Sequence, residues 1–287
     1  TIKAGESYFI PPGHLPVMDK AAVMIEFSQD ETYSFLAGQK PTGGPMPASP
    51  DEGLGIFCQP CQTELAETEP TKVMGDPAAK IWMKKEYGRQ MARLAISAGF
   101  DWAKTVSPML PGCPDWCPST HFGYLESGEM GVKLKNGNSY TIKAGESYFI
   151  PPGHLPVMDK AAVMIEFSQD ETYSFLAGQK PTGGPMPASP DEGLGIFCQP
   201  CQTELAETEP TKVMGDPAAK IWMKKEYGRQ MARLAISAGF DWAKTVSPML
   251  PGCPDWCPST HFGYLESGEM GVKLKNGNSY TIKAGES

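Results

Sequence analysis

An internal repeat constrains this chain more than any other feature of its sequence. Residues 1–147 are identical to residues 141–287, so the 287 residues consist of a 140-residue unit, its copy and a short overlap. A unit of this size is typical of one domain and can bury roughly two thirds of its unfolded surface. We therefore expect two copies of one fold. Identity without any divergence is typical of an engineered fusion, a uniform array or an excerpt of a longer concatemer.

Two Gly- and Pro-rich segments divide the chain. Residues 38–53 read GQKPTGGPMPASPDEG, have no apolar periodicity, and recur as residues 178–193. Such a composition predicts linkers, and the prolines favour an extended spacer. The linkers delimit a contiguous domain, residues 54–177, and a second domain made of residues 194–287 together with residues 1–37. The second domain is then completed by the start of this chain or by a neighbouring chain.

A permuted arrangement is the alternative, with units 8–147 and 148–287 and each linker closing within one unit. The two arrangements assign the histidines differently. In the first, His154 lies near Cys117, and His14 lies near Cys257. In the permuted arrangement these two histidines are exchanged. The stiff linkers favour the first arrangement.

Alternating hydrophobicity predicts β-strands within each unit. The residues expected to face the core are Ala92, Leu94, Ile96, Val132, Leu134, Val163, Ile165 and Phe167. Asn136-Gly137 predicts a hairpin with a type I′ turn, which needs positive φ at both central residues. The segment 76–87 is ambiguous between helix and strand. Many short strands separated by Gly and Pro predict an all-β fold, either a barrel or a double-sheet sandwich.

Charge and hydropathy exclude several functions. The net charge is -8, and no cluster of Lys and Arg is present, which argues against nucleic-acid binding. The longest apolar stretches, such as residues 161–165, are too short to span a bilayer. The chain opens without a basic and apolar leader, so no targeting segment is visible and the compartment stays unassigned.

The chemistry-bearing residues concentrate in one part of the unit. Its two histidines are His121 and His154, and Cys113 and Cys117 precede His121 at four-residue intervals. Thiolate and imidazole are ligands for borderline-soft metals. The four residues would make a Cys2His2 zinc set, or an open three-ligand site without Cys113. An extended chain separates residues four apart by about 13 Å, so a shared ion requires a turn between them. Pro114 and Pro118 favour such turns.

Two motifs resemble those of small cupins: Cys117-x3-His121 followed by GYLESG, and IPPGH ending at His154. The resemblance covers residues 89–167, and Thr105 stands where related cupins often have a histidine. It implies a cupin-like β-barrel or jelly roll with a metal at its mouth. The implied ligands are Cys117, His121 and His154, and in the copy Cys257, His261 and His14; Cys113 and Cys253 are further candidates.

Other motifs favour structural roles. Cys58-Gln-Pro-Cys61 is a CxxC without a βαβ context, so a disulfide, a bridge to another unit or free thiols are favoured over redox catalysis. Glu126 and Glu129 are expected to be solvated carboxylates at a strand edge. Aromatic residues could line a pocket mouth or simply pack in the core. They are Trp102, Trp116, Phe122, Tyr124 and Phe149.

Three functions remain open. As an enzyme, each unit would use a divalent metal (zinc, iron, nickel, copper or manganese) to polarise a small oxygenated substrate. As a binding module, it would hold a small-molecule ligand without turnover. As a structural building block, identical units would self-associate into a filament or polyprotein array. The identical repeat favours the third function, because catalysis needs no tandem copies whereas arrays do.

Overall fold

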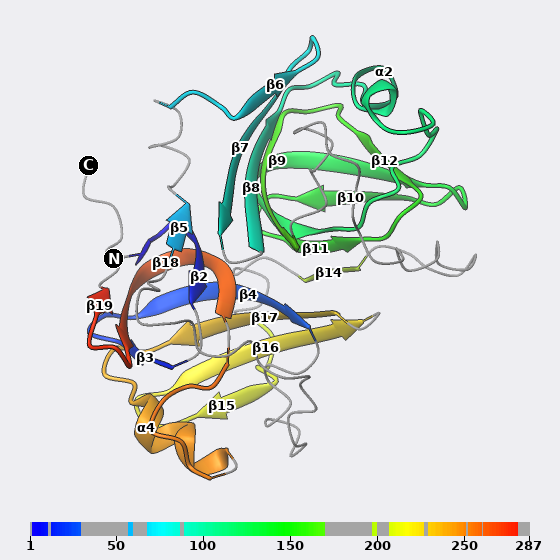
Figure 1. Cartoon of the computed structure of the whole chain (residues 1–287). Coiled ribbons are helices and arrows are strands. Elements are labelled where there is room, and N and C mark those ends of the chain that lie inside the picture. Colours follow the sequence, from blue (N-terminus) through cyan, green and yellow to red (C-terminus); the bar gives the residue numbers. More distant parts are fainter. Residues whose placement is uncertain are drawn as a thin grey trace. The chain divides into compact units, whose positions relative to one another are not determined.

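The computed structural model forms two compact units, each built from antiparallel strands (Figure 1). Unit 1 comprises Thr1–Ala66 and Leu205–Ser287, and unit 2 comprises Glu67–Glu204. The prediction of an all-β fold in two similar halves is confirmed. The described residues are 2–10, 13–29, 57–59, 68–86, 89–169, 197–199, 207–226, 229–250, 252–259 and 261–280.

Unit 2 contains the strands of one complete copy. Its elements are β6 (Lys72–Met74), β7 (Ala79–Glu86), β8 (Arg89–Ile96), α2 (Trp102–Thr105), η2 (Ser107–Met109), β9 (His121–Leu134), β10 (Ser139–Lys143), β11 (Ser147–Ile150), β12 (His154–Val157), β13 (Ala162–Gln169) and β14 (Phe197–Gln199). Strand β14 pairs with β11, so unit 2 extends past the predicted linker 178–193. The observed unit is therefore shifted along the chain relative to the predicted domain 54–177.

Unit 1 repeats this set from both ends of the chain. Its elements are β1 (Ile2–Lys3), β2 (Ser7–Ile10), β3 (His14–Val17), β4 (Ala22–Gln29), β5 (Phe57–Gln59), β15 (Lys212–Met214), β16 (Ala219–Glu226), β17 (Arg229–Ile236), α4 (Trp242–Thr245), η4 (Ser247–Met249), β18 (His261–Leu274) and β19 (Ser279–Tyr280). In unit 2, β10 pairs with the second half of β9. In unit 1, two short strands, β19 and β1, together pair with the equivalent part of β18.

The long strand β9 joins the two sheets of unit 2. Its first half pairs with β11 and β13, and its second half pairs with β10 and β12. The pairing with β13 shifts register between Val163 and Met164, and Gly128 beyond the bulge has φ +81°. A strand that leaves one sheet for another needs such a bulge or bend. The bend brings the start of β9 and the start of β12 to the same end of the interior.

The interior of unit 2 is apolar, and β8 and β9 contribute the predicted residues. Ala92, Leu94 and Ile96 belong to the buried cluster, as do Val132 and Leu134. These inward assignments are confirmed. Each fully buried Leu, Ile or Val side chain stabilises the fold by about 1.5–3 kcal/mol relative to its exposed state.

The alternating pattern of β8 predicts a strand that is buried on one face, but the structure buries both of its faces. On its opposite face, Met91 is 0 % and Arg93 1 % exposed. Arg93 donates from Nε and Nη2 to the two carboxylate oxygens of Glu126, at 3.1 and 3.0 Å. A buried guanidinium requires a charged partner, so Glu126 is not the solvated carboxylate that we predicted. Glu129 is more exposed and bonds Lys160 at 3.0 Å.

Strand β13 has the opposite phase from the prediction. Met164 belongs to the interior cluster and Glu166 lines an interior cavity. Ile165 and Phe167, predicted to face inward, lie on the other face and are buried there. When both faces of a strand are buried, its hydrophobic pattern does not determine which face points to the core.

One turn and one ambiguous segment are now defined. The Asn136-Gly137 hairpin forms, but only Gly137 has positive φ, at +91°. The Leu134 carbonyl accepts from the Gly137 amide at 2.9 Å, so a three-residue loop replaces the expected type I′ turn. In the ambiguous segment, residues 79–86 form strand β7, with Ala79 and Ile81 facing the core. Within the described part of the chain, no helix is long and apolar enough to cross a membrane.

Candidate metal centre

The backbone brings Cys117 next to His154. The Cys117 amide donates to the His154 carbonyl at 2.9 Å, and the Gly153 amide donates to the Cys117 carbonyl at 2.8 Å. This bridge joins the loop before β9 to the first residue of β12. The chain then turns between Cys117 and His121, as a shared site requires, because the Cys117 Sγ and His121 Nε2 atoms are 3.4 Å apart. The two ligand motifs therefore meet at one end of the interior.

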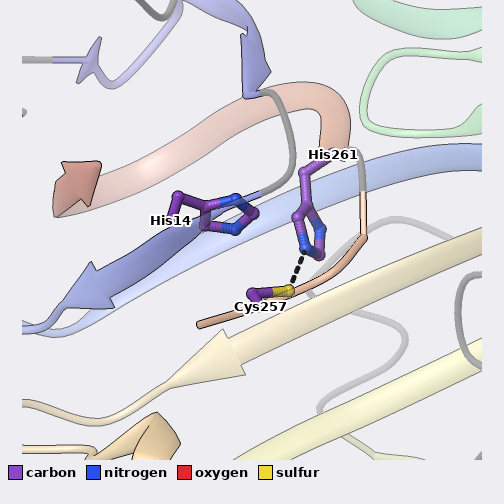
Figure 2. A group of neighbouring side chains, drawn as sticks. All are labelled: His14, Cys257 and His261. Atoms are coloured by element: carbon purple, nitrogen blue, oxygen red, sulfur yellow. Dashed lines mark hydrogen bonds between the residues drawn. The ribbon is translucent and has the colours of Figure 1, made fainter. Parts of the chain in front are cut away.

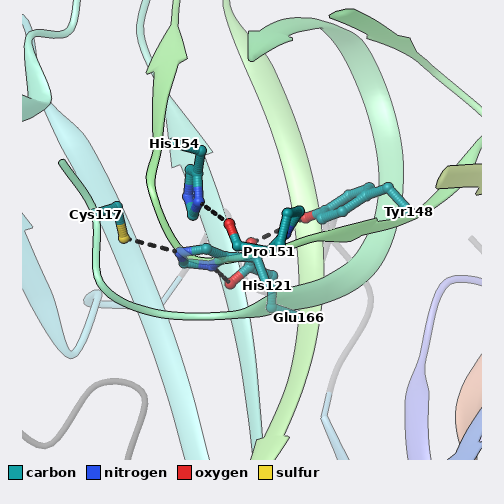
Figure 3. A network of polar contacts seen from close by, with 6 residues as sticks. All are labelled: Cys117, His121, Tyr148, Pro151, His154 and Glu166. Atoms are coloured by element: carbon teal, nitrogen blue, oxygen red, sulfur yellow. Dashed lines mark hydrogen bonds and ion pairs between the residues drawn. The ribbon is translucent and has the colours of Figure 1, made fainter. Parts of the chain in front are cut away.

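His121 is held by a chain of buried polar groups (Figure 3). Its Nδ1 atom lies 2.7 Å from Glu166 Oε2, and Tyr148 donates its hydroxyl to Glu166 Oε1 at 3.0 Å. Tyr148 is 0 % and Glu166 5 % exposed. A carboxylate that accepts from one imidazole nitrogen fixes the ring orientation and directs the other nitrogen elsewhere. Here the other nitrogen, Nε2, points at the Cys117 sulfur.

His154 is oriented in the same way by a different acceptor. Its Nδ1 atom lies 2.6 Å from the Pro151 carbonyl oxygen, which can only accept. A proton is therefore assigned to Nδ1, so that the neutral form of the ring has its lone pair on Nε2. The rings of His121 and His154 lie edge to face, with centroids 4.9 Å apart. Both histidines thus bond through Nδ1, so Nε2 is the nitrogen that a metal ion could bind once a charged ring has released its Nε2 proton.

The three side chains are spaced almost as a bound metal ion would require, and they would have to move slightly closer together to bind one. The ligand atoms of Cys117, His121 and His154 all lie within 4.8 Å of one another. On a tetrahedral ion with bonds of 2.0–2.3 Å, ligand atoms lie about 3.5 Å apart. The Cys117 and His121 atoms already have this spacing, and the widest pair would close by about 1 Å.

Unit 1 builds the same group from distant parts of the chain (Figure 2). His14, Cys257 and His261 have ligand atoms within 4.8 Å of one another, and Sγ of Cys257 is 3.4 Å from Nε2 of His261. His261 Nδ1 lies 2.8 Å from Glu26 Oε2, and Tyr8 donates to the same carboxylate at 3.0 Å. The histidines are thus grouped as the contiguous-domain arrangement predicts and not as the permuted arrangement predicts.

Burial and charge act in opposite directions on the Cys117 thiol. Burial alone would raise its pKa, but the charge of His121 and hydrogen bonds from His121 and His154 outweigh burial and lower the pKa to about 5. Burial likewise opposes the charged form of His121. The nearby Glu166 carboxylate and Cys117 thiolate nevertheless raise the His121 pKa well above its ordinary value. The metal-free site is therefore a thiolate and an imidazolium at neutral pH.

This charge state predicts a pH titration of the metal-free protein. Acidification from pH 8 should remove thiolate absorbance at 240 nm with a midpoint near pH 5, because the thiol pKa is lowered to about 5 in both units. The measurement is ultraviolet absorbance after chelator treatment. The double variant Cys117→Ser with Cys257→Ser serves as the control and should lack this transition. Absence of a transition near pH 5 would contradict the ion pair, because a thiol with the ordinary pKa of about 8.5 is already mostly protonated at pH 8.

A cavity of about 80 Å³ adjoins the three ligand residues. Its walls are mostly apolar, and an equivalent cavity of about 80 Å³ adjoins the site in unit 1. Of the five aromatic residues proposed to line a pocket, Trp102 does so. Phe122 and Phe149 instead contact each other edge to face, with ring centroids 6.2 Å apart. Cys117, His121 and His154 therefore border a mostly apolar cavity.

Two further candidate ligand positions lie outside the group. Cys113 and its copy Cys253 are exposed free thiols with φ of 42°, and the metal-ligand groups do not include them. Thr105 packs against Gly75, since a Cβ added to Gly75 would lie 2.9 Å from the Thr105 side chain. The CxxC hypothesis is not tested, because Cys61 lies outside the described residues and of Cys58 only the backbone is described.

Sequence reasoning missed Glu166 and Tyr148. Glu166 is the single charged residue in the apolar run from Ala162 to Phe167, and that isolation was the available signal. A lone acid in a strand that is otherwise apolar must be either solvated or paired. Tyr148 carried no comparable signal, because tyrosines in strands are commonly plain core residues.

Comparison with known proteins identifies no family. No family model matches the sequence, and no curated protein matches it. Among solved structures, the chain is similar to the crystal structure of protein NMB1881 from Neisseria meningitidis, with 17% sequence identity and a TM-score of 0.27. The match covers 38% of this chain and 94% of that one. A likeness of this size carries no functional argument, so the chemistry of the site follows from its own residues.

Proposed function

We propose that each unit is a cupin-like module that binds one divalent metal ion through Cys117, His121 and His154, or through Cys257, His261 and His14. The ion would be presented to a small molecule in the adjoining cavity. One observation carries this proposal: the Nδ1 atoms of both histidines in unit 2 are bound to acceptors, which leaves their Nε2 atoms for the space beside the thiol. Histidines that ligate metals have this arrangement.

The donor set narrows the choice of metal. One thiolate and two imidazoles suit zinc and copper, whereas manganese prefers oxygen ligands. Three protein ligands also leave a fourth position, which is typical of catalytic rather than structural zinc sites. When bound, the ion would supply Lewis acidity to a ligand in the cavity. Glu166 would keep His121 oriented, and the apolar walls would exclude water.

The metal proposal predicts a stoichiometry of two. Chelator-treated protein titrated with Co²⁺ should take up two ions per chain, because the two groups are equivalent. Thiolate ligation should produce a sulfur-to-cobalt charge-transfer band in the near ultraviolet, and zinc should displace it. Elemental analysis after gel filtration checks the count. Uptake of no metal, or cobalt absorbance without the thiolate band, would contradict the proposal.

Assembly into an array stays a prediction. The identical repeat supports it, but the linkers 38–53 and 178–193 on which it depends lie outside the described residues. Metal binding and assembly are compatible, because each candidate site consists of residues of a single unit. Light scattering of the full chain at increasing concentration would test self-association separately from metal content.

A further inference from the structure

The cavity beside the ligand group has its polar residues at one end. Cys117, His121, His154 and Glu166 form the bonded group, and Ser119 is the other polar lining residue. The remaining walls are apolar. They consist of aliphatic and aromatic side chains and methionines, and Val106 is one of them. Among the described residues, no Lys or Arg lines the cavity.

The charges of the loaded site are already balanced. A divalent ion, the Cys117 thiolate and the Glu166 carboxylate together carry no net charge. A carboxylate or phosphate ligand would therefore add an uncompensated negative charge within apolar walls, which costs several kcal/mol in effective desolvation. A cationic ligand would likewise carry an uncompensated charge, because the Glu166 carboxylate already bonds His121 and Tyr148. The electrostatics thus favour an uncharged ligand.

The volume limits the ligand further. About 80 Å³ is roughly half the 150 Å³ of an engineered apolar cavity that admits benzene. The part of a ligand that lies inside this space therefore has roughly four to six non-hydrogen atoms. The apolar walls require most of these atoms to be carbon, because an unpaired polar atom buried there would lose its hydrogen bonds with water.

We infer that the ligand of each cavity is a compact, uncharged, mostly aliphatic molecule with one oxygen, nitrogen or sulfur donor directed at the ligand group. This inference rests on the proposed metal site for the role of the donor atom. Its charge limit also depends on the charge of the proposed ion, whereas its size limit comes from the cavity alone. The two parts can therefore fail separately.

The experiment uses the zinc-loaded full chain and two isosteric probes, isobutyramide and isobutyrate, in isothermal titration calorimetry. Isobutyramide should bind at two sites per chain and at least tenfold more tightly than isobutyrate. Equal or tighter binding of isobutyrate, or binding of neither probe, would overturn the inference. Zinc content measured on the same sample tests the proposed function independently. A chain that holds no zinc but still prefers the amide would retain the ligand class and refute the metal.

The size limit has its own test. Benzamide should bind the native chain at least tenfold more weakly than isobutyramide does. Val106 and Val246 line the two cavities. Their joint substitution, Val106→Ala with Val246→Ala, should improve benzamide binding at least threefold. The matched control, Val163→Ala with Val23→Ala, changes strand residues that do not line the cavities and should leave benzamide binding unchanged. Equal improvement in both variants would overturn the cavity assignment.

Discussion

Replacing Cys117 by serine is expected to remove one of the two metal ions that we propose each chain binds. The serine hydroxyl stays protonated, so the site loses its only anionic ligand atom. The affinity of unit 2 should fall by more than the 10- to 100-fold that is typical when a residue supporting a metal ligand is lost. Unit 1 keeps His14, Cys257 and His261, and thus serves as an internal reference within the same molecule. Elemental analysis and competition with a chromophoric chelator measure both effects.

Two further variants make this result specific. Cys113→Ser changes an exposed thiol four residues away and should leave two ions per chain. Glu166→Gln keeps the shape of the side chain but weakens its hold on His121, so we expect an intermediate loss of about 10- to 100-fold in affinity at unit 2. Retention of two tightly bound ions in Cys117→Ser would refute the site.

The largest loss of stability is expected from alanine at Gly128 and its copy Gly268. Both have positive φ, +81° and +84°, which costs an L residue about 1–2 kcal/mol. A Cβ at Gly128 would also overlap the carbonyl oxygen of Ala161 and lie 2.8 Å from the Ala162 Cα atom. Backbone on the facing strand would therefore have to shift. We expect a total loss of about 3 kcal/mol or more per unit.

A matched control separates the steric part from the conformational part. Gly137 and Gly277 also have positive φ, but a Cβ there would meet no atom within 4 Å. Alanine at these two positions should cost only about 1 kcal/mol per unit. Urea denaturation of the two double variants measures the difference. Equal losses of unfolding free energy in the two double variants would show that the close approach of the facing backbone to Gly128 and Gly268 does not contribute to the loss.

The sequence predicted which thiol and imidazole side chains lie together better than it predicted the strand faces. Cys117, His121 and His154 could be found because thiols and imidazoles are rare in this chain and lie near turn residues. The phase of β13 could not be found, because Met164 and Ile165 are both apolar and both faces of the strand are buried. Glu166 could not be assigned to His121 because the contact depends on how β13 pairs with β9.

The unit boundaries show a related limit. A Gly- and Pro-rich composition indicates where regular structure is interrupted, but it does not say which domain the flanking strands join. Strand β14 follows such a segment and still pairs with β11 of the preceding copy. Three residue pairs between β14 and β11 determine which unit this segment joins. The local sequence of Phe197–Gln199 does not predict these pairs.

The two units have one sequence but should fold in a fixed order. In unit 2, 45 residues separate His121 from Glu166, whereas 235 residues separate His261 from Glu26 in unit 1. Closing the longer loop costs about 1.5 kcal/mol more in chain entropy. During synthesis, unit 2 can complete its sheets while strands β2, β3 and β4 still await β18. Their unpaired edges would be exposed to other nascent chains for that time. Unit 1 should therefore depend more on chaperones than unit 2, although the two units share one sequence.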